Sequence, residues 1–108
     1  MFARNISIHL KPNMLNEFSI AFENEVVPVL RKQAGFRDEM VLSGDNTNNV
    51  TAISLWDSQE QADTYATTTY SDVVKMLDKY LDGPPKVRVM NVINSTSHKL
   101  TAAAVVAA

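Results

Sequence analysis

The stretch TAISLWDSQEQADTYATTTYSDVVKMLDKY, residues 51–80, decides the fold. Its first six residues alternate between two sets of side chains and end on the only tryptophan, which is the period of a strand. Either Ser58 with Gln61 or Asp57 with Glu60 then has the spacing of a capping box, which marks the start of a helix. A strand followed at once by a helix is therefore predicted here.

A second helix is expected directly after the first. Three consecutive threonines, residues 67–69, crowd the chain with β-branched side chains and are expected to end or bend the first helix. Ser71 is the expected cap of the second helix, whose apolar stripe begins at Val73. Gly83, followed by two prolines, is expected to end it, because glycine favours the left-handed helix terminus and proline cannot continue a helix.

Three more strands follow from the same alternation of side chains. The expected strands of the chain are residues 2–10, 36–43, 50–56 and 86–94. A polar turn at residues 44–49, rich in residue types that tolerate positive φ, is expected to join the second and third strands in a hairpin.

One long helix is expected between the first two strands. Its apolar stripe runs from Leu15 to Leu30, and Asn13 is the expected cap. Pro28 falls inside this pattern and is expected to kink the helix, because it lacks the amide donor. Gly35 suits the left-handed terminating position.

The predicted order is β-α-β-β-α-β, with the second helix broken in two. This order is typical of an α+β, ferredoxin-like domain, in which helices cover one face of a single antiparallel sheet. We expect this domain to span residues 1–98 and an apolar C-terminal tail to follow at residues 99–108.

The second face of the predicted sheet is also apolar. In the third strand Ile53 and Leu55 oppose Ala52 and Trp56, and the single chain has no further layer to cover both sides. The simplest cover is the same face of a second copy, so we expect a homodimer, with the tail 99–108 packing on the partner. The alternative is an open face with scattered exposed apolar groups, which monomers tolerate.

Composition limits the function classes. The chain has 108 residues, no cysteine, two histidines and a formal net charge of −2. These numbers indicate one domain with no thiolate metal site, and no metal ion is expected. Interspersed charges argue against a nucleic-acid partner, and no apolar run is long enough for a membrane span. The N-terminus lacks the pattern of a signal peptide, so a cytoplasmic protein is expected.

Four segments of the chain resemble a known family. They are LKP at 10–12, EVVPVLRKQAGF at 25–36, ISLWDSQEQADTY at 53–65 and NSTSH at 94–98. The chain resembles the antibiotic-biosynthesis-monooxygenase (ABM) type of dimeric α/β-barrel protein. This resemblance implies face-to-face dimers and a pocket between sheet and helices in each subunit. It also implies a choice among cofactor-independent monooxygenases of polyketide quinones, haem-degrading enzymes and members without known activity.

The haem-degrading branch of that family fits this sequence poorly. The resemblance implies an Asn on the first strand, a Trp on the helix after the third strand and a His on the next helix. Asn5 matches the first, but Tyr65 stands where the Trp belongs and Asp78 stands near the place of the His. The histidine that would be the axial ligand of the haem iron is therefore missing, and we expect neither haem nor any other cofactor.

A cofactor-free oxygenase needs a dry pocket, a base and donors for a developing oxyanion. His9 is the candidate base, Asn5 projects from the same strand face, and His98 follows the last strand. The candidate substrate-binding residues are Trp56, Tyr65, Tyr70, Phe22 and Arg88. For each of these residues a structural role is the alternative, with hydrogen bonds to neighbours for the polar ones and core packing for the aromatic ones.

Two functions are thus left open by the sequence. The first is a cofactor-independent monooxygenase acting on an aromatic or quinone-type small molecule. The second is a homodimer that binds a small ligand without catalysis, or has a purely structural role. An enzyme should hold Asn5, His9 or His98 in an enclosed cavity, whereas a non-enzyme should have that cavity filled by Met14, Phe18, Phe22 and Met76.

Overall fold

A computed structural model describes residues 1–44 and 48–100 of the chain. The strands are β1 (Phe2–His9), β2 (Phe36–Ser43), β3 (Asn49–Trp56) and β4 (Lys86–Asn91). The helical segments are α1 (Leu15–Ala21), the π-helix η1 (Phe22–Val26), α2 (Val27–Arg31), α3 (Gln59–Thr68), α4 (Tyr70–Leu77) and the 3₁₀-helix η2 (Asp78–Tyr80).

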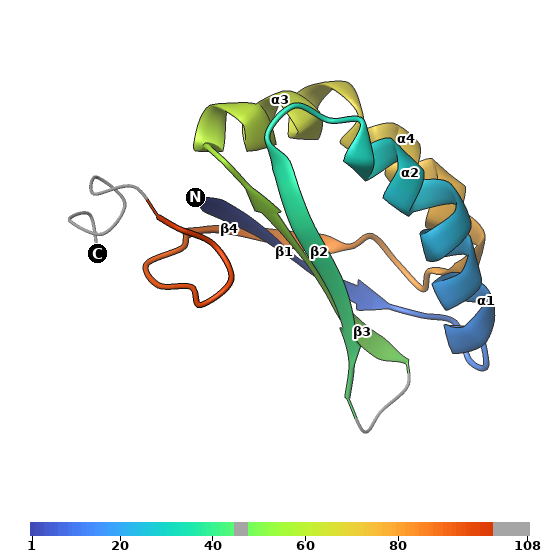
Figure 1. Cartoon of the computed structure of the whole chain (residues 1–108). Coiled ribbons are helices and arrows are strands. Elements are labelled where there is room, and N and C mark those ends of the chain that lie inside the picture. Colours follow the sequence, from blue (N-terminus) through green and yellow to red (C-terminus); the bar gives the residue numbers. More distant parts are fainter. Residues whose placement is uncertain (45–47, 101–108) are drawn as a thin grey trace.

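The four strands form one antiparallel sheet in the order β2-β3-β1-β4. The helices lie together on one side of this sheet (Figure 1). In each β-α-β unit one strand of the other unit lies between the two strands, so the two units interleave. The predicted α+β, ferredoxin-like fold is therefore confirmed.

The core lies between the helices and the sheet. Its most buried large side chains come from every layer: Trp56 from β3, Phe18 from α1, Val26 from η1 and Leu10 just after β1. In β3 alternate residues from Val50 to Trp56 are buried, as a strand with one covered face requires.

The first helix begins and continues differently from the prediction. Asn13 has a φ of 64°, and Met14 takes the N-cap position without a side-chain cap, so the predicted cap at Asn13 is wrong. Pro28 does interrupt the α-helix, and the interruption is η1. Because proline lacks the N–H that would bond the carbonyl four residues earlier, the chain widens into π-helix there. Pro28 thus falls in the first turn of α2, where its missing donor costs least.

The break between α3 and α4 lies at the predicted threonines. Ser58 is the N-cap of α3, and its Oγ accepts from the Gln61 N–H at 3.2 Å, which confirms one of the two predicted boxes. Thr69, with φ −129°, separates the helices and is the N-cap of α4, so the predicted cap at Ser71 is wrong. Thr68 also returns its hydroxyl to the Thr64 carbonyl at 2.6 Å, a back-bond of the kind that often bends helices.

Two strands depart from the predicted pattern. Strict alternation along β2 would place Phe36 on the same face as Met40. A register shift between Phe36 and Asp38 instead places Phe36 on the helix side of the sheet together with Glu39. β4 ends at Asn91, three residues before the predicted end. At this edge strand every residue is exposed, because the helices lie over β1 and β3.

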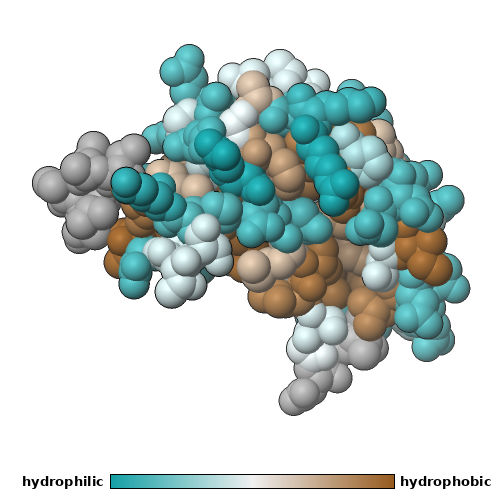
Figure 2. Space-filling view, in the orientation of Figure 1, coloured by the Kyte–Doolittle hydropathy of each residue, from teal (hydrophilic) through white to brown (hydrophobic). Residues whose placement is uncertain are grey.

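The side of the sheet away from the helices carries two cross-strand rows of mixed character. They are Met40–Ile53–Asn5–Arg88 and Asp38–Leu55–Ala3–Met90. We call this side the open face. Met40 is 44% exposed, whereas Ile53 and Leu55 are half-buried. Hydrophobic residues reach the surface in the middle of the view where β2 runs (Figure 2).

Parts of two sequence predictions lie outside the described residues. They are residues 45–47 of the hairpin turn and residues 101–108 of the apolar tail. The predicted domain end at residue 98 and the packing of the tail on a partner stay predictions.

Candidate functional site

A cavity of about 40 Å³ lies between the helices and the sheet. At about 10–15 Å³ per water, it has room for two or three waters. Its wall is mostly apolar, and the side chains with polar atoms are Glu39, Ser54, Tyr65 and Tyr70. The apolar part includes Ile6, Ile8, Phe22, Val26, Leu30, Ala52, Val73 and Pro85. An apolar wall with a few convergent polar groups is the usual character of a small-molecule site.

Arg4 is 4% exposed and does not itself line this cavity, but it packs on two residues that do. Its guanidinium carbon is 4.7 Å from the ring centroid of Tyr70 and 5.5 Å from that of Tyr65. Such cation–π contacts stabilise a buried cation by about 1–2 kcal/mol each. Its Nε has no hydrogen-bond partner in the described part of the chain. A buried cation with an unpaired donor is suited to an anionic ligand.

An aromatic chain holds the two tyrosines in place. Phe36 meets Trp56 edge-on at 5.6 Å, Trp56 stacks on Tyr65 at 4.9 Å, and Tyr65 meets Tyr70 at 6.1 Å between ring centroids. Trp56 is fully buried, and its Nε1 donates to Ser54 Oγ at 2.9 Å. Trp56 therefore packs behind the cavity wall and does not line it.

Both cavity tyrosines keep their hydroxyl protons. Burial raises the pKa of Tyr65 to about 12, and Tyr70 raises it further while Arg4 opposes the shift. Burial likewise raises the pKa of Tyr70, again against Arg4. The Tyr70 hydroxyl has no hydrogen-bond partner among the described residues. It is therefore a free donor at the cavity.

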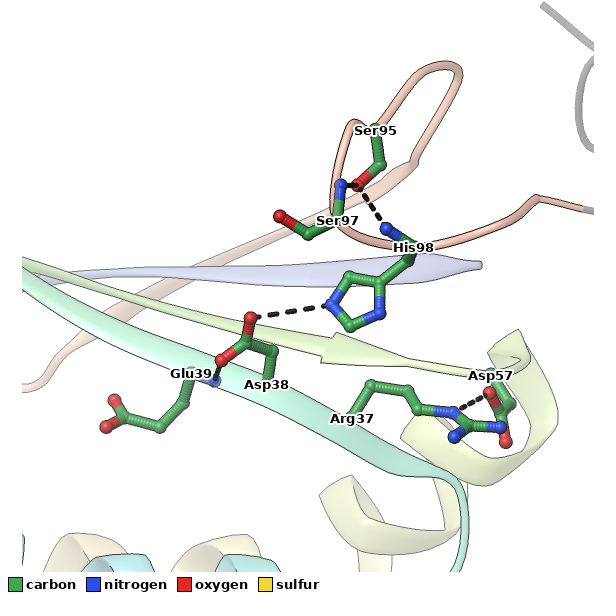
Figure 3. Close-up of polar contacts among 7 residues, drawn as sticks. All are labelled: Arg37, Asp38, Glu39, Asp57, Ser95, Ser97 and His98. Atoms are coloured by element: carbon green, nitrogen blue, oxygen red, sulfur yellow. Dashed lines mark hydrogen bonds and ion pairs between the residues drawn. The ribbon is translucent and has the colours of Figure 1, made fainter.

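Glu39 provides the only carboxylate among the lining residues of this cavity. Its Oε2 is buried and has no hydrogen-bond partner within residues 1–44 and 48–100. Burial raises the pKa of Glu39, and the carboxylates of Glu23 and Asp38 raise it further. Asp38 and Glu39 leave β2 in opposite directions, Asp38 toward His98 and Glu39 toward the helices (Figure 3).

The predicted site residues are divided between the two faces of the sheet. Phe22, Tyr65 and Tyr70 line the cavity. Asn5 and Arg88 are paired with each other on the open face. Their predicted roles at the cavity do not fit this position, because odd-numbered residues of β1 point away from the helices.

The two histidines also lie away from the cavity. His9 contacts Asn49 through Nδ1 at 2.6 Å, and its Nε2 is 3.8 Å from a carboxylate oxygen of Asp82. His98 is held over the open face, with Nε2 3.4 Å from Asp38 Oδ2 and its amide donating to Ser95 Oγ (Figure 3). Neither histidine is among the residues that line the cavity.

The residues expected to fill the cavity do so in part. Phe22 lines it and Phe18 is fully buried beside it, with their ring centroids 5.8 Å apart. Met76 is 36% exposed and Met14 is half-buried, and neither lines the cavity.

Arg4 and Glu39 were missed by sequence reasoning. Arg4 has the same parity as Ile6 and Ile8 in β1, and this alternation was the signal available. Within the described ranges, no group of three or more His, Cys, Asp or Glu side chains could hold a metal ion. In the same ranges no helix is both long and apolar enough to cross a bilayer.

Solved structures share this architecture at low sequence identity. The monooxygenase ActVA-Orf6 of Streptomyces coelicolor, in complex with nanaomycin D, is 18% identical with a TM-score of 0.70, over 82% of this chain and 84% of that one. SnoaB, a cofactor-independent oxygenase from Streptomyces nogalater, is 14% identical with a TM-score of 0.72, over 90% and 97%. At these identities the likeness concerns the fold.

A third solved structure has a similar extent. It is described as a putative antibiotic biosynthesis monooxygenase from Bordetella bronchiseptica and is 14% identical with a TM-score of 0.71, over 86% of this chain and 98% of that one. The search of curated proteins gave no match. A family model described as antibiotic biosynthesis monooxygenase matches residues 1–73. Since this match spans more than half of the chain, the protein belongs to the antibiotic biosynthesis monooxygenase family.

Proposed function

We propose that this protein is a cofactor-independent monooxygenase that acts on a small aromatic molecule in the cavity between helices and sheet. The observation that carries the proposal is Arg4, a buried guanidinium over the rings of Tyr65 and Tyr70 with an unpaired Nε. Burying a cation away from a carboxylate costs several kcal/mol. A site that binds an aromatic anion gives this cation a partner.

The chemistry requires a substrate that supplies all the electrons. When an acidic CH₂ group of an aromatic ring system becomes a ketone, two C–H bonds break and four electrons pass to O₂. One oxygen atom enters the carbonyl group and the other leaves as water. The protein then needs to exclude water, position the ring and stabilise the carbanion or phenolate. Arg4, together with the protonated Tyr70 hydroxyl, is suited to the last task.

The size of the cavity favours a second candidate function. Space for two or three waters is less than an aromatic ring needs, so binding requires side chains such as Phe22 or Tyr70 to move. If they do not move, the protein is a non-catalytic homodimer, and Arg4 is a structural cation between two aromatic rings.

We also propose that a second copy covers the open face. The support is the pair of rows that contain Met40, Ile53, Leu55 and Met90, of which the first and last are exposed at 44% and 40% in the single chain. Exposed apolar side chains gathered on a sheet face typically mark an interaction surface. A two-fold axis would place each row against its own copy.

Oxygen uptake with a panel of hydroquinones and anthrones tests the monooxygenase. Arg4→Met keeps the packing of the side chain and removes its charge, and it should lower kcat/KM by about 10²–10³, as loss of one oxyanion donor does. Arg31→Met, at an exposed position of α2, is the matched control and should retain the rate of the wild type. Ligand binding without oxygen uptake would support the non-catalytic function instead.

A further inference from the structure

We propose that Glu39 takes a proton from the bound ligand while Arg4 holds the negative charge at the other end of the same row of the sheet. The ligand class would then be a conjugated ring with an acidic hydroxyl or C–H at one end and a charge-accepting oxygen group at the other. This inference depends on the proposed function of the cavity.

The register of the sheet places the two charged groups on one line. Glu39 is paired with Ser54, and Ser54 is paired with Arg4. Directly paired residues share a face, and neighbouring strands are about 4.8 Å apart, so the Cα atoms of Glu39 and Arg4 are about 10 Å apart. Ser54 between them already accepts from the Trp56 indole. The row therefore presents a carboxylate, a neutral hydroxyl and a cation in that order.

This order matches a ring that loses a proton at one end and gathers charge at the other. Conjugation carries the negative charge away from the group that loses the proton, so base and cation do not need to contact the same atom. Both side chains leave the sheet on the same face, and the roughly 10 Å between their Cα atoms is comparable to the length of one ring with an oxygen at each end and two side-chain contacts. A carboxylate without the cation would not favour a ligand that has a charge-accepting group at its far end.

Glu39 is suited to accept a proton. Its Oε2 is buried without a partner in the described chain, and a raised pKa makes its carboxylate a stronger base than an exposed one. The charged groups that surround it are Glu23 on η1, Asp38 on the far side of β2 and Arg4 on its row. The other titratable groups of the cavity are the hydroxyls of the α3 and α4 tyrosines, which stay protonated.

Glu39 also stands at the boundary between the cavity and the surface. A second hollow of about 130 Å³ lies between η1 and β2, and its lining includes Glu23, Val41 and Ser19. Glu39 and Phe22 line both this hollow and the inner cavity. Glu23 and Ser19 are exposed, so the hollow reaches solvent. A ligand that enters by displacing Phe22 therefore meets Glu39 first.

The proton step balances without another reactant. The O–H or C–H bond of the ligand breaks, its electron pair stays on the ring, and the proton forms an O–H bond on Glu39 Oε2. In turnover the proton returns to the oxygen that leaves as water. With a ligand that only binds, the proton stays on Glu39.

Binding of 4-nitrophenol tests the inference, because its phenolate and its neutral form have different absorption spectra. Its hydroxyl and its charge-accepting nitro group lie at opposite ends of the ring. Below the pH at which the free probe ionises, the wild type should bind it as the phenolate and release no proton to the buffer. Glu39→Gln should lower the bound phenolate fraction at least tenfold. The control is Glu25→Gln, at an exposed position of the π-helix η1, which should behave as the wild type.

Nitrobenzene, which has no proton to lose, separates binding from proton transfer. The wild type and Glu39→Gln should bind it with equal affinity, and Glu39→Asp, which keeps a carboxylate, should restore part of the phenolate signal. If Glu39→Gln binds 4-nitrophenol as the phenolate to the same extent as the wild type, Glu39 is not the proton acceptor. If the wild type binds neither compound, the cavity admits no aromatic ring, and the proposed function is overturned together with this inference.

Discussion

Replacing Gly35 with alanine should destabilise the protein through two separate effects. Gly35 lies between α2 and β2 with φ +81°, a conformation that side chains with a Cβ rarely adopt. Its carbonyl accepts from the Asp57 N–H at 2.8 Å, which fixes the start of β2 against the start of α3. An added Cβ would overlap the carboxamide of Gln61 and lie 2.8 Å from the Gln61 Cβ.

The expected loss can be worked out from these two effects. A left-handed alanine costs about 1–2 kcal/mol. Displacing the Gln61 carboxamide breaks the hydrogen bond that its Oε1 accepts from the Ser58 hydroxyl at 3.2 Å, and the clash at the Gln61 Cβ pushes on the backbone N–H that Ser58 caps; loss of an N-cap costs about 0.5–2 kcal/mol. Together these lower the free energy of unfolding by about 1.5–4 kcal/mol. At about 4 °C per kcal/mol for a domain of this size, the melting temperature should fall by about 6–16 °C.

Urea unfolding followed by Trp56 fluorescence measures this change. Gly83→Ala is the matched control: its φ is +94°, but a Cβ there would meet no atom of the described residues within 4 Å, so it should cost only the backbone strain of about 1–2 kcal/mol. In the double variant Gly35→Ala, Gln61→Ala the overlap with the carboxamide is removed, but the 2.8 Å approach to the Cβ of residue 61 remains, so the steric part should shrink without disappearing. If Gly35→Ala is as stable as the wild type, or if Gln61→Ala does not change its cost, the reasoning from this contact is wrong.

The remaining predictions concern the open face, the cavity floor and pH. Met40→Lys places a charge in the row that the second copy would cover, so it should raise the dissociation constant of the proposed dimer at least 100-fold in sedimentation equilibrium. Met76→Lys, on the helix layer, should leave this constant unchanged. A wild type that is monomeric at micromolar concentration would contradict the dimer. Ser54→Ala should lower the free energy of unfolding by about 1–3 kcal/mol, because the fully buried Trp56 N–H loses its acceptor; unchanged urea curves would show that it finds another. Since the pKa of Glu39 is raised in the folded state, the folded protein binds this proton more tightly, and its contribution to stability is present at low pH and lost as the pH rises through the raised pKa. Glu39→Gln should remove this part of the pH dependence in urea titrations across that range, and a slope identical to that of the wild type would show that the carboxyl is not perturbed.

The fold could be predicted because its signals are local. The alternation in residues 36–43 gave β2 with its observed bounds, and the spacing of Ser58 and Gln61 gave the start of α3. Each signal involves neighbours in sequence, so no tertiary contact is needed to read it. The cap at Asn13 failed because Met14 follows it and the chain turns through a positive φ before the helix begins.

The polar part of the site could not be predicted in the same way. Arginine and glutamate are rarely buried, so Arg4 and Glu39 were not assigned to the covered face from their residue types. The parity of β1 would have placed Arg4 correctly. In β2, however, the register shift after Phe36 moves the residues that follow it, Glu39 among them, to the opposite face from the one that strict alternation predicts. This bulge has no clear sequence signal.

The position of the proposed chemistry follows from which side of β1 is closed to water. Asn5 and Arg4 are neighbours in sequence, yet they lie on opposite faces, so an oxyanion can be stabilised by one or by the other but not by both. On the open face of the single chain, solvent screens the charge and weakens any hydrogen bond to it. On the helix side Arg4 is 4% exposed and packs on two rings, so its field acts in a medium of low dielectric. A charge that develops on a bound ring is therefore stabilised far more by Arg4 than by the amide of Asn5, although Asn5 is the residue that family resemblance singled out.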